Sequence, residues 1–382
     1  MTRSALAAVV CAIALWQAAI AANAFAATRA ACPAMPGRSL VLISARTGAV
    51  DRDFPDVSAN AVVSDGHGGW FVAGSFSCVG GVHVPGLVRL DHHGRLDRGW
   101  HAVLPRGRRF EGIAVLVRAG PTLYAGGTFG IEALAASNGA RRWLAPVTAP
   151  STGAGVEAIA AGPGRVFVGG DYGSIAGSRR HSLAALDPAT GHVLAWRYPV
   201  LKGFVPSPSV EALAVAGRRL YLGGTTITRV DGARRPGLAA FDAISGRLSS
   251  WTPGTAPGLN PGYGVGDVET ILVSRDTVIT AGHDGFGAVS ARTGRIEPWM
   301  RRLQGVAYRF ASYGGTLYLG GNVRNSFSAA GAYPRDNLAA VDPASGRFTA
   351  WGPRLARFVG VSSMAADRDE VLVAGSFTPT LG

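Results

Sequence analysis

A repeated unit constrains the fold of this 382-residue chain more than any single residue does. One copy, residues 217–251, reads GRRLYLGGTTITRVDGARRPGLAAFDAISGRLSSW. Each copy contains a Gly-Gly or Ala-Gly step, whose second glycines are Gly74, Gly127, Gly170, Gly224, Gly282, Gly321 and Gly375. Each copy ends on an aromatic residue, and these are Trp100, Trp143, Trp196, Trp251, Trp299 and Trp351, with Phe54 in the seventh slot. The chain therefore carries seven copies of one unit.

Each unit predicts four short β-strands. In the unit that contains the copy quoted above, residues 210–217 and 219–224 form two β-prone runs, and residues 237–243 and 247–251 form two more. Glycine and proline separate the runs, which favours a small antiparallel sheet. One such sheet cannot bury both of its faces, so the units must stack on one another. We therefore expect an all-β protein, a seven-bladed β-propeller of four-stranded antiparallel blades.

The two ends of the repeat region complement each other. The last copy stops after two strands, whereas residues 39–54 (SLVLISARTGAVDRDF) read as a third and a fourth strand with nothing before them. Joining these fragments completes the C-terminal blade and leaves no open sheet edge. We expect residues 39–54 to close the ring and residues 39–382 to form a single domain.

Two known repeat types resemble this pattern. The copies RLDHHGRLDRGW and SARTGAVDRDF resemble the secreted bacterial propellers built from the repeat called delta sixty, a family without an agreed function. The segment LAALDPATGHVLAW is similar to the tryptophan docking repeat of quinoprotein-like propellers, which include pyrroloquinoline quinone dehydrogenases and non-catalytic scaffolds. The resemblance covers residues 39–382 and implies the fold more strongly than a function.

The N-terminal residues predict export. A basic start, an apolar run and a small-x-small site at Ala24 and Ala26 indicate a signal peptide over residues 1–27, with an uncleaved membrane anchor as the alternative. Residues 28–38 are a short segment before the propeller, and no later stretch is long enough to span a membrane. Two cysteines remain after cleavage, and we expect a Cys32–Cys78 disulfide, with lipid modification of Cys32 as the alternative. The mature protein is expected to be secreted or associated with the cell envelope.

The net charge of +13 does not predict nucleic-acid binding. All but one of the 37 basic residues are arginine, the exception being Lys202, and they are spread over all units without a basic helix or an aromatic platform. We expect a monomer that binds an extracellular protein or polysaccharide, with an acidic polymer as one option.

Glutamates recur at one position of the first predicted strand. They are Glu111, Glu157, Glu211 and Glu269, with Gln304 next in the series and Asn60 before it. The first strand of a propeller blade is the innermost, so these side chains are expected at the mouth of the central channel. Two carboxylates about 8 Å apart repel by roughly 2 kcal/mol at an effective dielectric constant of 20. A Ca²⁺ ion, a basic ligand or a raised pKa would relieve this repulsion. The alternative is that each glutamate accepts hydrogen bonds from backbone amides of the adjoining blade.

Long connections are expected on the same rim. They include residues 197–209, residues 252–267 and the loops around Arg179, Arg234 and Arg335. Long loops on one face usually mark a binding face. Tyr198, Phe204 and Tyr263 are the aromatic residues expected to contact a ligand there.

No catalytic motif stands out in the sequence. The eight histidines lack zinc-site spacing, and Asp187, Asp242 and Asp342 recur in a turn that aspartate caps. We therefore expect a binding or scaffold module without a catalytic residue and without a cofactor, apart from the Ca²⁺ option. A carbohydrate-active hydrolase or lyase using two of the glutamates stays open, as does a quinone-dependent dehydrogenase.

Overall fold

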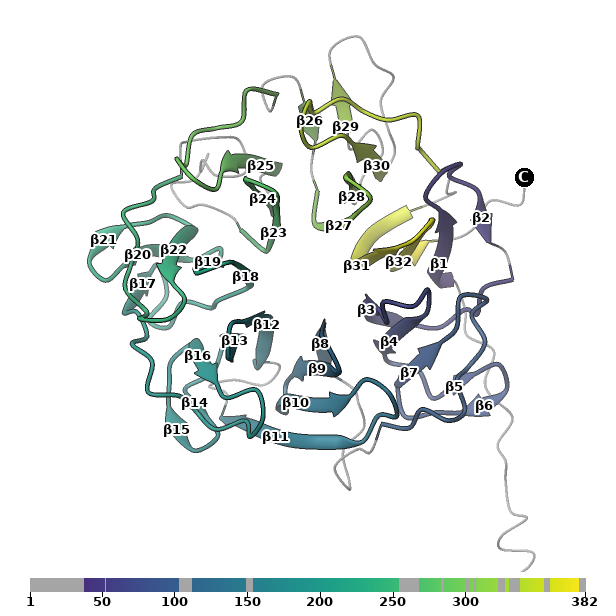
Figure 1. Cartoon of the computed structure of the whole chain (residues 1–382), viewed down its shortest axis with the longest axis horizontal. Coiled ribbons are helices and arrows are strands. Elements are labelled where there is room, and N and C mark those ends of the chain that lie inside the picture. Colours follow the sequence, from purple (N-terminus) through teal and green to yellow (C-terminus); the bar gives the residue numbers. More distant parts are fainter. Residues whose placement is uncertain are drawn as a thin grey trace, which may run out of the picture.

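Strands arranged around a central opening make up this structure, a computed structural model (Figure 1). It describes residues 38–51, 53–102, 112–148, 154–253, 268–282, 285–299, 303–305, 307–321, 327–329, 337–353 and 358–377. Every named element of these ranges is a β-strand, which confirms the predicted all-β class. None of the described residues belongs to a helix long and apolar enough to cross a membrane.

The first three predicted strands of each unit form antiparallel sheets in the expected order. The innermost strands are β3 (Ala59–Ser64), β8 (Ile113–Ala119), β12 (Val156–Gly162), β18 (Ala212–Ala216), β23 (Thr270–Ser274), β27 (Arg309–Tyr313) and β31 (Phe358–Asp367). The second strands are β4 (Trp70–Gly74), β9 (Thr122–Gly127), β13 (Arg165–Gly170), β19 (Arg219–Gly223), β24 (Thr277–Gly282), β28 (Thr316–Gly320) and β32 (Glu370–Phe377). The third strands are β7 (Leu87–Leu90), β10 (Gly130–Ala135), β16 (Leu183–Leu186), β22 (Leu238–Asp242), β25 (Gly285–Ser290), β30 (Leu338–Val341) and β1 (Arg38–Ser44).

The fourth predicted strand is shorter than expected. Only β2 (Val50–Asp51) and β11 (Arg141–Thr148) are assigned as strands at this position. In five other units the segment makes one isolated bridge, as between Leu186 and Val193 or between Phe241 and Leu248. The chain then leaves its own sheet because the tryptophan that follows contacts the next unit.

These tryptophans connect successive units. The indole Nε1 of Trp143 donates a hydrogen bond to the Pro188 carbonyl at 2.9 Å, and Trp251 donates to the Ser290 carbonyl at 3.1 Å. Each carbonyl belongs to a turn of the following unit. The same turn requires glycine at residue 191, where φ is +73° and a Cβ atom would lie 2.6 Å from the Trp143 ring.

Phe54 occupies the slot that tryptophan fills elsewhere. It is buried, and a Cβ atom on Gly94 would lie 2.9 Å from its ring. Gly94 belongs to the turn of the following unit, just as Gly191 does for Trp143. This contact confirms the place of Phe54 in the repeat.

Segments from the two ends of the described chain share one sheet, in the order β2-β1-β32-β31. Strand β1 pairs antiparallel with β32, with Leu42 opposite Leu372 and Ser44 opposite Glu370. The indole Nε1 of Trp351 also donates to the Ser44 carbonyl at 2.8 Å. Residues near the N-terminus therefore supply the third strand of the C-terminal unit, as predicted.

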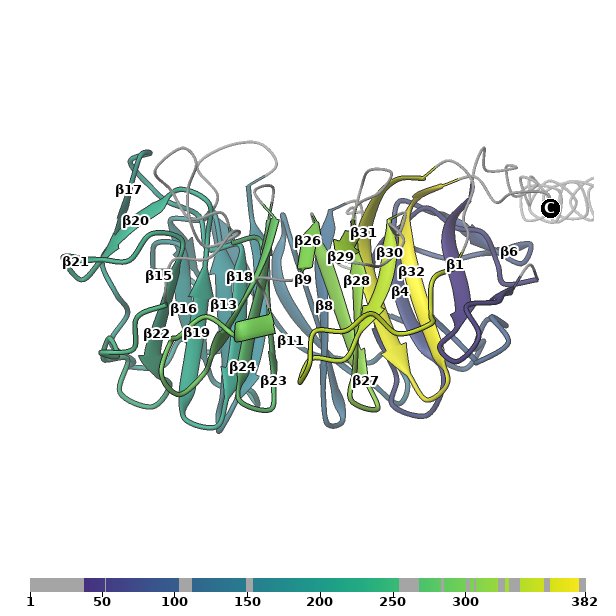
Figure 2. The same ribbon diagram turned by 90° about the horizontal axis from the view of Figure 1, so that it is seen from above.

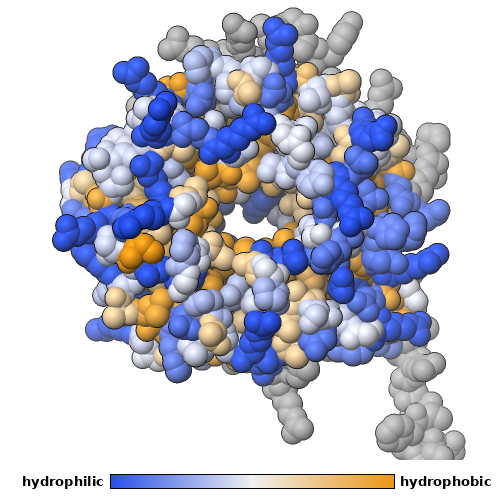
Figure 3. Space-filling model, in the orientation of Figure 1, coloured by the Kyte–Doolittle hydropathy of each residue, from blue (hydrophilic) through white to orange (hydrophobic). Residues whose placement is uncertain are grey.

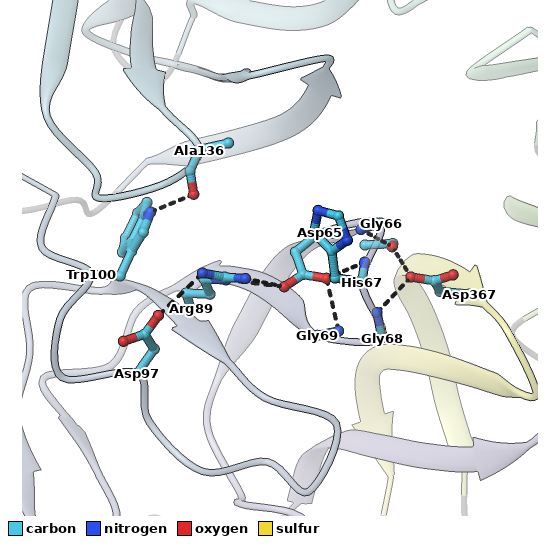
Figure 4. A network of polar contacts seen from close by, with 11 residues as sticks. Asp65, Gly66, His67, Gly68, Gly69, Arg89, Asp97, Trp100, Ala136 and Asp367 are labelled. Atoms are coloured by element: carbon cyan, nitrogen blue, oxygen red, sulfur yellow. Dashed lines mark hydrogen bonds and ion pairs between the residues drawn. The ribbon is translucent and has the colours of Figure 1, made fainter.

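Polar contacts join this sheet to the first unit that follows it. The carboxylate of Asp367 accepts hydrogen bonds from Ser64 Oγ at 2.5 Å and from Gly68 N at 3.2 Å (Figure 4). Asp65, in the same turn as Gly68, accepts two hydrogen bonds from Arg89 at 3.0 and 2.7 Å. The turn between β3 and β4 is thus fixed both to its own sheet and to the neighbouring one.

Further strands lie outside the first three of each unit, some as separate small sheets and some as an outward extension of an inner sheet. Hairpins β5 (Cys78–Val79)–β6 (Val82–His83), β14 (Ser174–Ile175)–β15 (Ser178–Arg179) and β20 (Ile227–Val230)–β21 (Ala233–Arg234) each follow a second strand. Chain from the preceding unit pairs with such segments, namely β11 with β14, β17 (Leu201–Gly203) with β20, and β26 (Leu303–Gly305) with β29 (Phe327–Ala329). Part of the connection predicted as a loop over residues 197–209 is therefore a strand.

The hydrophobic core is divided among the interfaces between neighbouring sheets. In one cluster Phe167 and Ala185 of one unit pack with Val210, Leu213 and Leu222 of the next. Small alanines alternate with larger aliphatic residues along these strands, which lets adjacent sheets approach closely.

Candidate functional site

The innermost strands enclose a central cavity of about 770 Å³. Figure 3 shows it as a hollow in the middle of the molecule, with hydrophobic residues gathered around it. Its walls are mostly alanine, valine, leucine and isoleucine. The charged residues that line it are Glu157, Glu211, Glu269 and Arg309.

Three of the predicted glutamates occupy one register position. Glu157 is the residue at a bulge of β12, between Val156, paired with Gly170, and Ala158, paired with Gly169. Glu211 and Glu269 directly precede β18 and β23, and their amides donate to the Gly223 and Ala281 carbonyls at 3.0 and 2.9 Å. The alignment predicted for these three residues is confirmed, and they come from three consecutive units.

The predicted equivalence of Gln304 is wrong. Gln304 lies on β26, which pairs with β29 in an outer sheet rather than lining the channel. The register position belongs to Tyr308, whose amide donates to the Gly320 carbonyl at 2.7 Å. The apolar run at residues 303–306 resembles a first strand, but here an additional outer strand precedes the inner one.

Glu111 lies outside the described residues. In its unit the register position is held by Ala114, which sits between Ile113, paired with Gly127, and Val115, paired with Gly126. The alignment of Glu111 with Glu157 was therefore wrong by three residues. Asn60 was aligned correctly, since it occupies the corresponding bulge of β3. In the C-terminal unit Ser362 occupies this position.

Each of two glutamates has a hydroxyl partner. The carboxylate of Glu157 accepts a hydrogen bond from Ser209 Oγ of the next unit at 2.7 Å. Glu211 accepts one from Thr225 Oγ1 of its own unit at 2.7 Å and a longer one from the Thr225 amide at 3.4 Å. The predicted alternative named backbone amides of the adjoining blade. At Glu157 the adjoining unit supplies a side-chain hydroxyl instead, and at Glu211 the amide that donates belongs to the glutamate's own unit.

Burial raises the pKa values of these two carboxyls, and neighbouring negative charges add to the shift. Burial raises the pKa of Glu211 to about 7, and the charges of Glu157 and Glu269 add to this shift, while the Thr225 hydrogen bonds oppose it. Burial also raises the pKa of Glu157, with a further contribution from Asp171. Glu211 thus titrates near neutral pH between two other carboxylates.

Arg309 is a charged residue of this cavity that sequence reasoning missed. Its Nη1 lies 3.8 Å from Glu269 Oε2, and its Nε and Nη1 donate to the Ser362 and Tyr308 carbonyls at 2.8 and 2.7 Å. Burial lowers the pKa of Arg309, and the charges of Glu269 and Glu211 counteract this. The available signal was its place directly after the register position, at the start of the strand RFASY.

The other predicted binding residues do not line the channel. Arg179 is exposed on β15 and Arg234 is exposed on β21, and both strands lie at the outside of the ring (Figure 1). Tyr198 is 36% exposed, and the Arg180 guanidinium lies 4.7 Å from its ring centroid. The structure therefore brings three glutamates together but separates them from these three residues.

Two predicted residues, Tyr263 and Cys32, lie outside the described ranges. Cys78, on β5, belongs to a disulfide, and its Sγ is 3.5 Å from His83 Nδ1. The pairing of Cys32 with Cys78 stays a prediction. Within the described ranges, no group of three or more His, Cys, Asp and Glu side chains has the arrangement of a metal site.

The raised pKa of Glu211 predicts pH-dependent stability. The folded state binds more protons than the unfolded state between pH 4.5 and pH 7, so the free energy of unfolding should fall as pH rises through this window. Glu211→Gln keeps an oxygen that accepts from Thr225 and removes the charge. We expect this variant to be more stable than the wild type by about 2–3 kcal/mol above pH 7 and no more stable at pH 4. Urea unfolding at both pH values measures the difference, and an equal effect at both would contradict the assignment.

One protein family matches over most of the described repeats. The sequence profile of the family described as outer membrane protein assembly factor BamB matches residues 100–352, more than half of the chain. The chain belongs to this family. No protein of curated function matches the sequence.

Solved structures show the same fold at low sequence identity. The WD40 β-propeller domain of Doa1 matches with a TM-score of 0.53 and 11% identity, over 84% of this chain and 90% of that one. A chain of the Mitotic Checkpoint Complex matches with a TM-score of 0.50 and 13% identity, over 92% and 95% of the two chains. The extracellular domain of a hybrid two-component system from B. thetaiotaomicron has a TM-score of 0.44 and 14% identity, over 89% of this chain and 41% of that one. The first two matches show that this BamB-family chain is a β-propeller.

Proposed function

We propose that this protein is an exported, non-catalytic binding and scaffold module of the cell envelope, built as a closed ring of seven blades. The pairing of β1 with β32 and the hydrogen bond from Trp351 to Ser44 support the closed ring. The family description, an assembly factor of outer membrane proteins, supports a place in the envelope and a role in holding other proteins.

The channel mouth is the proposed binding site, and its ligand is a cationic group such as a lysine or arginine side chain of a partner. The observation that carries this proposal is the position of Glu211 between Glu157 and Glu269, with Arg309 as the one basic residue among the described residues of the channel lining. When all four groups are ionised, the lining carries a net charge of −2. A bound cation would stabilise the ionised form of Glu211 and relieve the repulsion that raises its pKa.

A defined basic probe tests this proposal. Calorimetry at pH 7 in buffers of different ionisation enthalpy measures the binding of a tetralysine peptide. Binding should release protons, because the ligand lowers the pKa of Glu211. Glu211→Gln should abolish the proton release, and Glu157→Gln together with Glu269→Gln should weaken binding on the order of tenfold or more. Asp276→Asn, an exposed carboxylate away from the channel lining, is the matched control. Absence of binding, or binding without proton release, would overturn the proposal.

The hydrolase alternative rests on the same pKa. A carboxyl that titrates near pH 7 suits a general acid, and an ionised neighbour suits a nucleophile or a base. A glycan panel incubated with the wild type and with the Glu157→Gln and Glu211→Gln variants separates the two functions. Turnover by the wild type that both variants lose would favour the hydrolase. The quinone-dependent dehydrogenase is tested by adding the cofactor and recording its absorbance.

A further inference from the structure

A small three-stranded sheet lies at the outer edge of the ring, in the strand order β17-β20-β21. Figure 2 shows β17 and β20 at the rim and β21 at the far edge of the molecule. The sheet is anchored from inside, because Leu201, Ile227 and Val230 pack in the core cluster between two units. Its outer residues are free to contact a second molecule.

Three cations lie side by side across this sheet. Lys202 is opposite Arg229 on the neighbouring strand, and Arg229 is opposite Arg234 on the next. All three residues are exposed. Residues directly opposite in antiparallel strands have Cβ atoms about 4.5–5.5 Å apart, and like charges at such positions destabilise a sheet.

No carboxylate of the described residues forms an ion pair with these three cations. The nearest acidic residue in the sequence is Asp231. Its carboxylate forms an ion pair with Arg197 Nη1 at 3.0 Å and accepts a hydrogen bond from the Val200 amide at 2.9 Å. The row therefore presents a concentrated positive charge that its own fold does not neutralise.

Apolar side chains flank the row. Val200 is 58% exposed, Phe204 is 65% exposed and Val205 is 41% exposed, and all three belong to the segment that contains Lys202. Exposed aromatic and aliphatic groups beside charged ones are typical of protein interaction sites. We call Val200, Lys202, Phe204, Arg229 and Arg234 the outer-rim patch.

We propose that the outer-rim patch binds an acidic segment of a partner protein, in which carboxylates alternate with apolar residues. The carboxylates pair with Lys202, Arg229 and Arg234, and the apolar residues cover Val200 and Phe204. A protein segment fits better than an acidic polysaccharide, because aliphatic side chains that could cover Val200 and Phe204 occur in proteins and not in polysaccharides. None of these residues lines the central channel, so this surface is separate from the site for a cationic group.

The single lysine of the chain gives this proposal a sharp test. The probe is a capped peptide in which glutamate alternates with leucine, and a lysine-leucine peptide is its control. A carbodiimide coupling agent should join a glutamate carboxylate of the bound probe to the Lys202 amine, and peptide mapping locates the cross-link. Lys202→Arg should keep the affinity but lose the cross-link.

Lys202→Glu should weaken binding of the acidic peptide on the order of tenfold. This change places opposite charges across β17 and β20, so it should not impair folding. Affinity should also fall as salt is added. The proposal is overturned if the acidic peptide does not bind, or if Lys202→Glu leaves its affinity unchanged. It is also overturned if polygalacturonate or phosphatidylglycerol vesicles bind at least as tightly with the same sensitivity to Lys202→Glu.

Discussion

Replacement of Trp351 by alanine is expected to lower the free energy of unfolding by about 3–5 kcal/mol. The indole is buried, its ring centroid lies 5.0 Å from that of Tyr318, and its Nε1 donates to the Ser44 carbonyl. The change removes this packing and also the contact between the unit that ends at Trp351 and β1, the third strand of the C-terminal unit. Denaturant unfolding followed by circular dichroism measures the loss.

Phenylalanine substitutions separate packing from hydrogen bonding in this contact. Trp351→Phe keeps an aromatic ring but loses the bond to Ser44, which should cost about 1 kcal/mol more than the same change at Trp299. Trp299 is the matched control, because its buried Nε1 has no hydrogen-bond partner among the described residues. Equal losses for the two phenylalanine variants would mean that the Trp351–Ser44 bond adds nothing to stability.

Arg141→Met is expected to destabilise the protein by about 3 kcal/mol at neutral pH. Glu132 is fully buried on β10 and forms an ion pair with Arg141 on β11, while its second carboxylate oxygen has no partner among the described residues. Removal of one partner from a buried ion pair leaves an uncompensated charge in the core. Burial raises the pKa of Glu132, so protonation at low pH removes that charge.

The cost of Arg141→Met should therefore grow as pH rises and should shrink toward pH 4. The double variant Glu132→Leu with Arg141→Met places two apolar residues in the same space and should recover most of the lost stability. Unfolding measured at pH 4 and pH 7 on both variants tests this account. A cost for Arg141→Met that does not change with pH would contradict it.

The repeat made much of the fold predictable from sequence. The glycine markers and closing aromatics placed the first three strands of each unit, because each of these residues has a specific packing role against its neighbour. Gly191 beneath Trp143 is one example, and Gly94 beside Phe54 is another. The fourth strand was less predictable, because the tryptophan at its end contacts the next unit and the segment makes few bridges to its own sheet.

The candidate site was predictable only where the unit kept its usual length. Glu157, Glu211 and Glu269 fell at one position because their first strands follow the repeat pattern. Gln304 was misassigned because β26 adds an outer strand whose apolar residues imitate an inner one. Arg309 was missed because its contacts with Glu269 and with the Ser362 carbonyl join different units, which no local pattern encodes.

The most direct test of the central claim, that three glutamates converge on one charged channel mouth, is a carbon-detected NMR titration of the glutamate side-chain carboxyls. The account predicts that the Glu211 carboxyl titrates near pH 7 and that its midpoint moves down when Glu157 and Glu269 are both replaced by glutamine. If the Glu211 carboxyl titrates near pH 4.5, or if its midpoint does not change with those two replacements, the carboxylates do not share one space.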